Sequence, residues 1–426
     1  MNPLLRVAFL IGILLIALTL SFLGTRNGLA EHWAESSQPQ GWLRAARLEP
    51  GNADYWFRLG QYQQLDFEPG DIPLAIFYYR RAVQVDPHSA DNWVALASAY
   101  EEADDRAEAR QAFEAAKAAY PTSSQVAWRY GNFLLRQNRL PEAFREIRSS
   151  IAADPKLAGP AISRCLRASG DMQGTLDQIL PAQVVVYLEA LSFLVAEQEM
   201  DAAVAIWERL VKLRPPLEMR SALSLLERLI EQNRVDQAKR VWQQALVLSG
   251  WSNSGSPAAL VWDGGFEGDF VNGGFGWRRL PIAGASLDFD TTVAHSGARS
   301  LRVMFDGSAN LDFAHLAQYV PVEPQTHYHF SAFLRTEKVS TNSGVCFVLF
   351  DPHHPAELSG STSCLVDTHS WIREDLDFTT GPQTRLIEIV LRRYPSQKLD
   401  NKIRGTVWVD DVSVAAVSQA EVRSSP

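Results

Sequence analysis

The sequence contains very little cysteine and no excess of positive charge. Three cysteines are too few for a disulfide framework or a four-thiolate zinc site, although one pair could bridge in an oxidising compartment. Lysine and arginine number 40 against 49 aspartates and glutamates, which gives a net charge of -9. Because binding to phosphate groups needs a basic surface, we expect no nucleic-acid partner.

Catalytic motifs are also missing from the sequence. It has no Gly-x-Ser-x-Gly elbow, P-loop, His-Glu-x-x-His motif or dinucleotide fingerprint. His353 and His354 lie in a proline-flanked loop, and His327 and His329 alternate on a strand with no cysteine or carboxylate at matching spacing, so we interpret both pairs as loop and sheet surface. We therefore expect no enzyme. A glycosidase is a distant alternative, because a sequence cannot reveal two carboxyl groups facing each other in a cleft.

One long apolar run lies near the N-terminus. Val7 to Leu23 carries no charge and would span roughly 25 Å as a helix. This length favours an uncleaved signal anchor at residues 1–30 over a signal peptide, whose apolar region is shorter; cleavage after Ala30 is the alternative. Arg6 precedes the run and Arg26 follows it, which predicts a cytoplasmic N-terminus. We expect a single-pass inner-membrane protein with the bulk of its chain in the periplasm or cell exterior.

Residues 31–250 repeat a pattern with a period of 34 residues, typical of a repeat architecture. Small residues recur where the two helices of a repeat would cross, so that their backbones can approach. Large residues fill the space beside them, and a proline ends the second helix. One copy consists of Trp93, Leu96, Ala97, Tyr100, Ala109, Phe113, Ala116 and Pro121. The pattern predicts about six units, with a half repeat at the front and a shortened repeat over 161–180.

This pattern resembles the tetratricopeptide repeat family. The resemblance implies an all-α superhelix of helix hairpins whose concave face holds a peptide or another protein. Candidate contacts on the first helices of the hairpins are Asn92, Arg129, Asn132 and Arg136. The alternative interpretation is that they are solvated polar residues.

The periodicity changes after a glycine- and serine-rich linker at residues 251–257. Segments such as 300–305 and 328–335 alternate in polarity and favour β-branched or aromatic residues, with Gly, Pro, Asn and Asp between them. This pattern predicts an all-β sandwich over 258–417, followed by a disordered tail at 418–426. The fold class is therefore multidomain: a transmembrane helix, an all-α superhelix and an all-β sandwich.

Four sequence blocks of this last domain resemble carbohydrate-binding module families four and nine, which are jelly rolls. They are Asp263–Glu267, Gly276–Trp277, His295–Gly297 and Trp408–Val412. The resemblance implies a structural calcium ion near the joined chain ends. Its ligands would include Glu267 and Asp410 or Asp411, with backbone carbonyls completing the shell.

The same resemblance implies that aromatic rings on one sheet contact a sugar. Candidates are Trp277, Tyr319, Phe333 and Trp371, with Arg335 as a polar partner. Strand alternation predicts that Phe333 and Arg335 share a face. The alternative for each aromatic is packing in the core.

Cys346 and Cys364 lie on two strand-like runs joined by a proline-rich loop, so antiparallel pairing could form a disulfide in an exported protein. Taken together, the sequence predicts a non-enzymatic, membrane-anchored envelope adaptor. It would couple a protein-binding superhelix to a glycan-binding or glycan-facing module, in exopolysaccharide or cell-envelope assembly. The alternative is a pure protein-interaction scaffold whose jelly roll binds no sugar.

Overall fold

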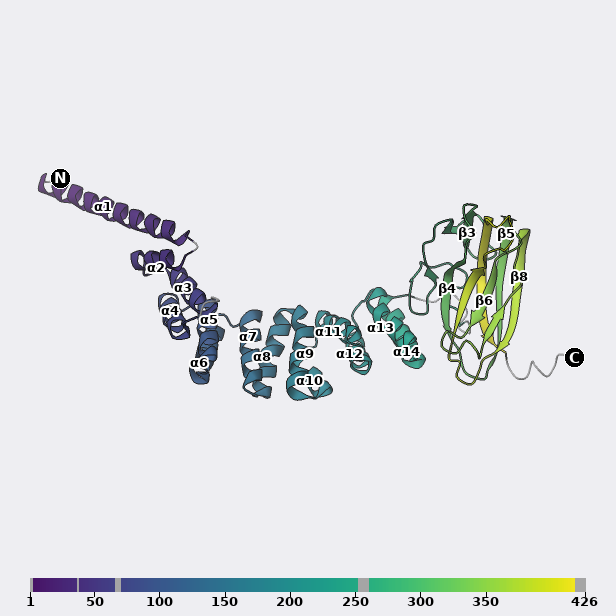
Figure 1. The fold of residues 1–426 in the computed structure, drawn as a ribbon, viewed down its shortest axis with the longest axis horizontal. Coiled ribbons are helices and arrows are strands. Elements are labelled where there is room, and N and C mark those ends of the chain that lie inside the picture. The colour runs from purple at the N-terminus through teal and green to yellow at the C-terminus, as the bar shows by residue number, and fades with distance from the viewer. Residues whose placement is uncertain (1–2, 37, 66–69, 252–259, 418–426) are drawn as a thin grey trace. The chain divides into compact units, whose positions relative to one another are not determined.

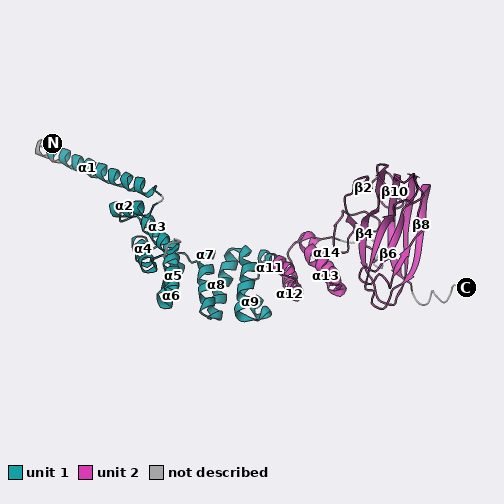
Figure 2. Cartoon of the chain, in the orientation of Figure 1, with its two compact units in different colours: residues 1–189 teal, residues 190–426 magenta. Residues whose placement is uncertain are grey.

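The computed structural model describes residues 3–36, 38–65, 70–251 and 260–417. The chain forms two compact units, residues 1–189 and 190–426, which Figure 2 colours separately. Their boundary lies within helix α11 (Val184–Ala196). Beyond Trp251, the predicted linker 251–257 and the predicted tail 418–426 lie outside the described residues.

Helix α1 (Pro3–Ala34) extends beyond the predicted apolar run. Within the described ranges, its segment Phe9–Ala34 is the only one long and apolar enough to cross a membrane, a test that an N-terminal signal sequence also meets. The end of α1 has a second role. Ala30 is fully buried in a cluster with Ala45 and Tyr55, and Trp33 packs against that cluster. One continuous helix therefore carries both the apolar span and part of the first packed cluster.

Hairpins of antiparallel helices make up the rest of the first unit (Figure 1). The elements are α2 (Pro39–Leu48), α3 (Ala53–Leu65), α4 (Ile72–Val85), α5 (Ala90–Glu102), α6 (Arg106–Ala119), α7 (Ser124–Arg136), α8 (Leu140–Ala153), the 3₁₀ turn η1 (Pro155–Leu157), α9 (Ala158–Ser169) and α10 (Met172–Ile179). Helix α3 packs on α4, α5 on α6 and α7 on α8. Helix α10 has 8 residues, which agrees with the shortened repeat expected at 161–180.

Local sequence explains where these helices begin and how closely they pack. Asp105 and Ser123 precede α6 and α7, and each side chain accepts a backbone N–H in the first turn of its helix. At the crossing of α7 and α8, a Cβ atom on Gly131 would lie 2.6 Å from Cγ1 of Ile147. Only glycine allows the two backbones to approach this closely. The repeat pattern thus reflects a steric requirement.

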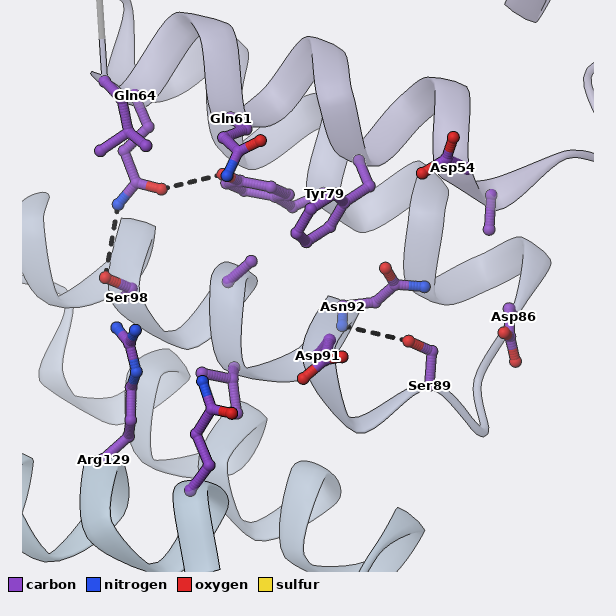
Figure 3. A pocket seen from close by; sticks show the side chains of 16 residues that line it. Asp54, Gln61, Gln64, Tyr79, Asp86, Ser89, Asp91, Asn92, Ser98 and Arg129 are labelled. Carbon is purple, nitrogen blue, oxygen red and sulfur yellow. Dashed lines mark hydrogen bonds between the residues drawn. The ribbon is translucent and has the colours of Figure 1, made fainter. Parts of the chain in front are cut away.

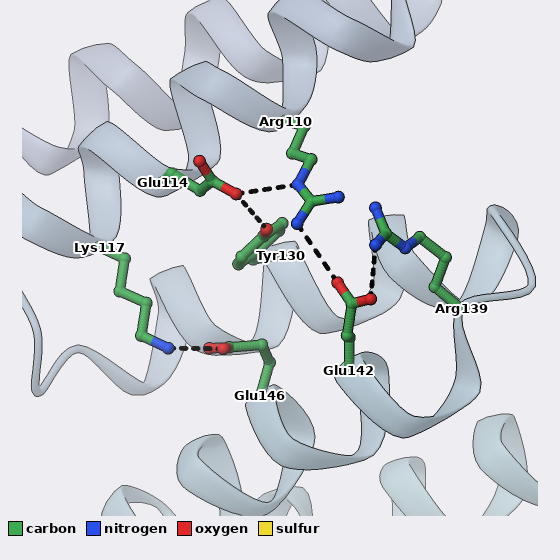
Figure 4. Close-up of polar contacts among 7 residues, drawn as sticks. All are labelled: Arg110, Glu114, Lys117, Tyr130, Arg139, Glu142 and Glu146. Atoms are coloured by element: carbon green, nitrogen blue, oxygen red, sulfur yellow. Dashed lines mark hydrogen bonds and ion pairs between the residues drawn. The ribbon is translucent and has the colours of Figure 1, made fainter.

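Ion pairs join successive hairpins on the surface formed by α6 and α8 (Figure 4). Nζ of Lys117 lies 2.5 Å from Oε1 of Glu146, and Arg110 reaches both Glu114 at 2.8 Å and Glu142 at 3.5 Å. Each exposed pair contributes less than about 1 kcal/mol to stability. Their value lies in linking neighbouring repeats, which contact little else in such an array.

The second unit contains the end of α11, three further helices and two β-sheets. Its elements are α12 (Met200–Lys212), α13 (Arg220–Glu231), α14 (Val235–Ser249), β1 (Arg278–Arg279), β2 (Ala285–Asp290), β3 (Ser300–Asp306), β4 (Phe313–Pro321), β5 (His327–Val339), β6 (Cys346–Phe350), β7 (Ser359–Ser361), β8 (Asp367–Thr379), β9 (Leu386–Arg393) and β10 (Arg404–Ala416).

The strands form a jelly-roll sandwich of two five-stranded antiparallel sheets. Sheet A has the order β1-β4-β9-β6-β7 and sheet B the order β2-β3-β10-β5-β8. Along β5, the side chains of Phe330, Ala332 and Leu334 are fully buried in the core, whereas Phe333 and Arg335 alternate with them and are half-buried. Phe333 and Arg335 therefore lie on the outer face of sheet B.

Candidate functional site

Three rings gather on the outer face of sheet B. The imidazole of His295 stacks on Phe333 with centroids 3.6 Å apart and an interplanar angle of 16°. The indole of Trp371 on β8 meets His295 edge-on at 5.6 Å. His295 is exposed, and the other two residues are half-buried. We call this set the aromatic cluster. Its rings lie at the surface of sheet B and not in the core, and His295 covers one face of the Phe333 ring.

Two carboxylates fix the position of His295. Strand β10 is irregular between Asp410 and Ser413, and Asp411 has a positive φ of 49°, so both aspartates face the turn that carries His295. Asp410 Oδ2 accepts the backbone N–H groups of His295 at 2.8 Å and Ser296 at 3.2 Å. Asp411 Oδ2 lies 2.6 Å from Nδ1 of His295. The imidazole is held over Phe333 because the bulge directs two consecutive acids at one turn.

A second polar and aromatic group lies beside the cluster on the same sheet. The guanidinium of Arg335 lies 5.2 Å from the centroid of the Trp408 ring, an attractive cation–π geometry. Trp408 itself is 6% exposed and donates from Nε1 to Asp290 at 2.9 Å. Burial would raise the pKa of Asp290, but hydrogen bonds from Thr292 and Trp408 outweigh it and hold that pKa below its usual range. The guanidinium of Arg335 thus lies over an indole ring that is itself fixed by its hydrogen bond to Asp290.

The other two predicted sugar contacts lie elsewhere. Trp277 is 2% exposed, and its Nε1 donates to the carbonyl of Asp263 at 3.1 Å, so its ring belongs to the core and cannot reach a ligand. Tyr319 lies on β4 of sheet A, where the Arg278 guanidinium covers it at 4.3 Å from the ring centroid. The structure therefore brings Phe333, Arg335 and Trp371 together and separates Trp277 and Tyr319 from them.

The predicted calcium ligands do lie close to one another, but N–H groups already occupy their oxygens. Glu267 Oε1 accepts the backbone N–H of Ala298 at 2.7 Å, while Asp410 and Asp411 bind the His295 turn. Burial raises the pKa of Asp410 to about 6, although the backbone donors oppose this. Within the described ranges no group of three or more His, Cys, Asp or Glu side chains could hold a metal. As arranged, this donor set does not fit the six to eight oxygen ligands of calcium, and calcium stays a prediction.

The first unit contains a groove of about 660 Å³ formed by α3, α4, α5 and α7 (Figure 3). Asn92 and Arg129 line it, together with Gln61, Gln64 and Asp91. Figure 3 shows the Arg129 side chain extending from α7 towards Ser98. The lining combines amides, which bind a peptide backbone, with charges of both signs.

Two predicted partner contacts are engaged within the first unit. Asn132 is 6% exposed, and its Oδ1 accepts from Arg164 at 2.6 Å. Arg136 forms a bidentate pair with Glu101, with distances of 2.6 and 2.7 Å. Of the four predicted contacts, Asn92 and Arg129 line the groove, although Asn92 is as deeply buried as Asn132, at 6% exposed.

Cys346 and Cys364 form a disulfide in the structure. The isolated bridge between Val345 and Leu365 places the two cysteines opposite each other beside β6. Cys165 is a free, buried cysteine, and burial raises the pKa of its thiol to about 12. A thiol in that state is inert at neutral pH.

Comparison with known proteins supports the repeats most directly. Residues 66–127 match the family model described as "Tetratricopeptide repeat". No curated protein matches the chain. Among solved structures, the chain is similar to MamA, with 15% identity, a TM-score of 0.33, and coverage of 42% of this chain and 94% of the other.

Two further similar structures are carbohydrate-binding modules. The "Family 16 Carbohydrate Binding Module-2" has 17% identity and a TM-score of 0.26, with coverage of 37% of this chain and 99% of that one. The xylan-binding CBM22-1 domain of Paenibacillus barcinonensis Xyn10C has 13% identity and a TM-score of 0.27, with coverage of 38% and 99%. At these values, neither likeness carries an argument about a ligand.

Proposed function

We propose that this chain is a non-enzymatic, membrane-anchored adaptor of the cell envelope. Its tetratricopeptide repeats bind a protein or peptide, and its jelly-roll domain binds or faces a glycan, in exopolysaccharide or cell-envelope assembly.

The aromatic cluster is the observation that carries the glycan-binding part. A ring face covers the C–H face of a pyranose, and nearby polar groups bind its hydroxyls, so both are needed in one place. His295, Phe333 and Trp371 supply the rings, and Arg335 lies two residues from Phe333 on the same face. The His295 turn is held by two carboxylates, so the rings are in position before a ligand arrives.

A glycan microarray tests this part with the full-length protein in detergent. We expect specific binding that is lost in Phe333→Ala and kept in Tyr394→Ala. Tyr394 is a suitable control because it is 49% exposed and takes no part in the cluster. No binding by the wild type, or equal binding by both variants, would refute glycan recognition at this face.

Membrane anchoring rests on α1. Phe9–Ala34 is apolar and long enough to span a bilayer. Ala30, near the end of this helix, packs against α2 and α3. Cleavage after Ala30 would cut a continuous helix and remove this buried residue from its cluster. The retained anchor places the repeats next to the inner membrane, with the bulk of the chain exported. The disulfide between Cys346 and Cys364 suits that oxidising side.

A second function is a protein-interaction scaffold without sugar binding. It is favoured by the positions of Trp277, which is buried in the core, and Tyr319, whose ring is covered by Arg278. A scaffold of this kind would show no array signal and would still bind its partner through the groove. Charge reversal at Arg129 would then abolish partner capture from envelope extracts, while Phe333→Ala would leave it unchanged.

A further inference from the structure

Helices α13 and α14 lie against the β-sandwich within the second unit. The indole of Trp242 on α14 meets the rings of Trp262 at 5.7 Å and Phe275 at 5.9 Å, both edge-on. Gly274 has a positive φ of 57°, and a Cβ atom there would lie 2.7 Å from the Trp242 ring. The loop before β1 is therefore shaped to receive this indole.

A second contact joins α13 to the start of sheet A. Both carboxylate oxygens of Glu227 bind Nη2 of Arg278, at 2.8 and 2.9 Å, and Oε1 also accepts the backbone N–H of Gly274 at 2.6 Å. Arg278 completes the link by donating from Nη1 to the Gly274 carbonyl at 2.9 Å. One guanidinium nitrogen bound by both carboxylate oxygens, with further hydrogen bonds to the Gly274 backbone, holds its geometry better than a single surface ion pair.

Arg278 is in turn part of the outer face of sheet A. It pairs with Ala317 across the ladder, and its guanidinium covers the ring of Tyr319. Across the next ladder, Tyr319 pairs with Glu388. Burial and the Glu388 carboxylate raise the pKa of Tyr319, and burial also raises the pKa of Glu388. Tyr319 and Glu388 are both half-buried, so the face around Tyr319 is partly shielded from water.

Two more ion pairs extend the contact to the opposite end of β4 and β9. Lys239 on α14 lies 3.4 Å from Glu323, just after β4, and Arg385, just before β9, lies 3.6 Å from Asp236 on α14. Together with the Glu227 contact, they place the hairpin beside the half of β4 that runs from Ala317 to its end and beside the start of β9.

We propose that the α13–α14 hairpin is a built-in cover of the Tyr319 face of sheet A, closed while Glu227 holds Arg278. The covered face carries an aromatic ring, a guanidinium and a carboxyl group, which is ligand-binding chemistry. A ligand that stacks on Tyr319 has to displace Arg278 and release the hairpin. Sheet B presents its outer face without this restriction. The inference goes beyond glycan binding at the aromatic cluster and does not depend on it.

The test is the accessibility of Tyr319 in the full-length protein, measured by hydroxyl-radical labelling and mass spectrometry. Glu227→Gln keeps the shape of the side chain but removes its charge, so we expect the labelling rate of Tyr319 to rise several-fold. Arg228→Gln is the matched control. It removes a neighbouring ion pair, with Glu231, from the same helix and should leave the rate unchanged.

Tyr394, which is 49% exposed, serves as an internal reference for labelling. Trp242→Ala removes the second contact that fixes the hairpin, between α14 and the loop before β1, so we expect it to raise Tyr319 labelling as well. Equal Tyr319 labelling in the wild type, Glu227→Gln and Trp242→Ala would overturn the proposal. Far-UV circular dichroism of each variant is first compared with that of the wild type, and only variants that keep the wild-type spectrum enter the labelling comparison.

Discussion

Single side chains in this protein act mainly by holding other groups in place. Asp410 and Asp411 fix the turn that carries His295, and Asp290 anchors the indole of Trp408 beneath Arg335. Glu267, Asp410 and Asp411 are the predicted calcium ligands. In the structure their oxygens accept hydrogen bonds from the turn at residues 295–298, and a motif cannot specify these contacts because the turn is distant in sequence.

Asp290 predicts a pH dependence of stability. Its folded-state pKa is depressed, so its contribution is fully present above the unfolded value of about 3.9 and is lost as the pH falls through the lower folded value. Asp290→Asn should therefore cost about 1–3 kcal/mol at pH 7 and much less near pH 2. Urea unfolding at pH 2, 4 and 7 measures this difference. A penalty independent of pH would contradict the assignment.

At Gly131 the prediction is steric. A methyl group there would meet Ile147 at 2.6 Å, so Gly131→Ala should destabilise the first unit by about 1–3 kcal/mol despite its better helix propensity. Gly51→Ala is the control, because no atom lies within 4 Å of its Cβ position. Thermal unfolding followed by circular dichroism compares the two. If the melting temperature of Gly131→Ala is no lower than that of Gly51→Ala, the close approach of α7 and α8 at Gly131 is contradicted.

At the scale of elements, the helices and the strand faces were predictable from sequence because each depends on local periodicity. Small residues at a fixed spacing identified the hairpins, and the alternation along β5 placed Phe333 and Arg335 outward. The aromatic cluster was only half predictable. His295 was missed because it reaches Phe333 through a bulge in β10, far away in sequence. His295-Ser296-Gly297 belonged to a recognised block, but nothing local indicated its stacking.

The docking of α13 and α14 was also unpredictable. It depends on the positive φ of Gly274 and on the fit of Trp242 between Trp262 and Phe275. A glycine-rich linker after α14 suggests independent domains, yet it says nothing about the contacts made by the surfaces on either side.

The disulfide gives a prediction for β6 and the segment after β7. Cys346 and Cys364 are separated by 18 positions, so reduction should destabilise the second unit by roughly 3 kcal/mol in the chain-entropy model. Denaturant unfolding with and without reductant measures the loss. The double variant Cys346→Ser/Cys364→Ser should be insensitive to reductant. A wild-type transition that does not move in reductant would contradict the bridge.

At the scale of the whole molecule, α1 joins an apolar segment long enough to cross a membrane to the first packed cluster of the repeats. Because Ala30 is fully buried against α2 and α3, we expect the mature protein to keep its N-terminal segment. Intact mass measurement of the protein extracted from membranes tests this expectation. A mature chain that begins at Glu31 and is released without detergent would show that the segment is a cleaved signal.

The central claim is that this anchored repeat protein recognises a glycan through the aromatic cluster. Isothermal titration of the strongest array ligand against the full-length protein tests it most directly. Removing one ring from the contact with the sugar should cost about 1.4 kcal/mol, so Trp371→Ala should weaken the Kd roughly tenfold, while Tyr394→Ala should leave it unchanged. Equal affinity of the wild type and Trp371→Ala, with both proteins folded, would contradict the claim.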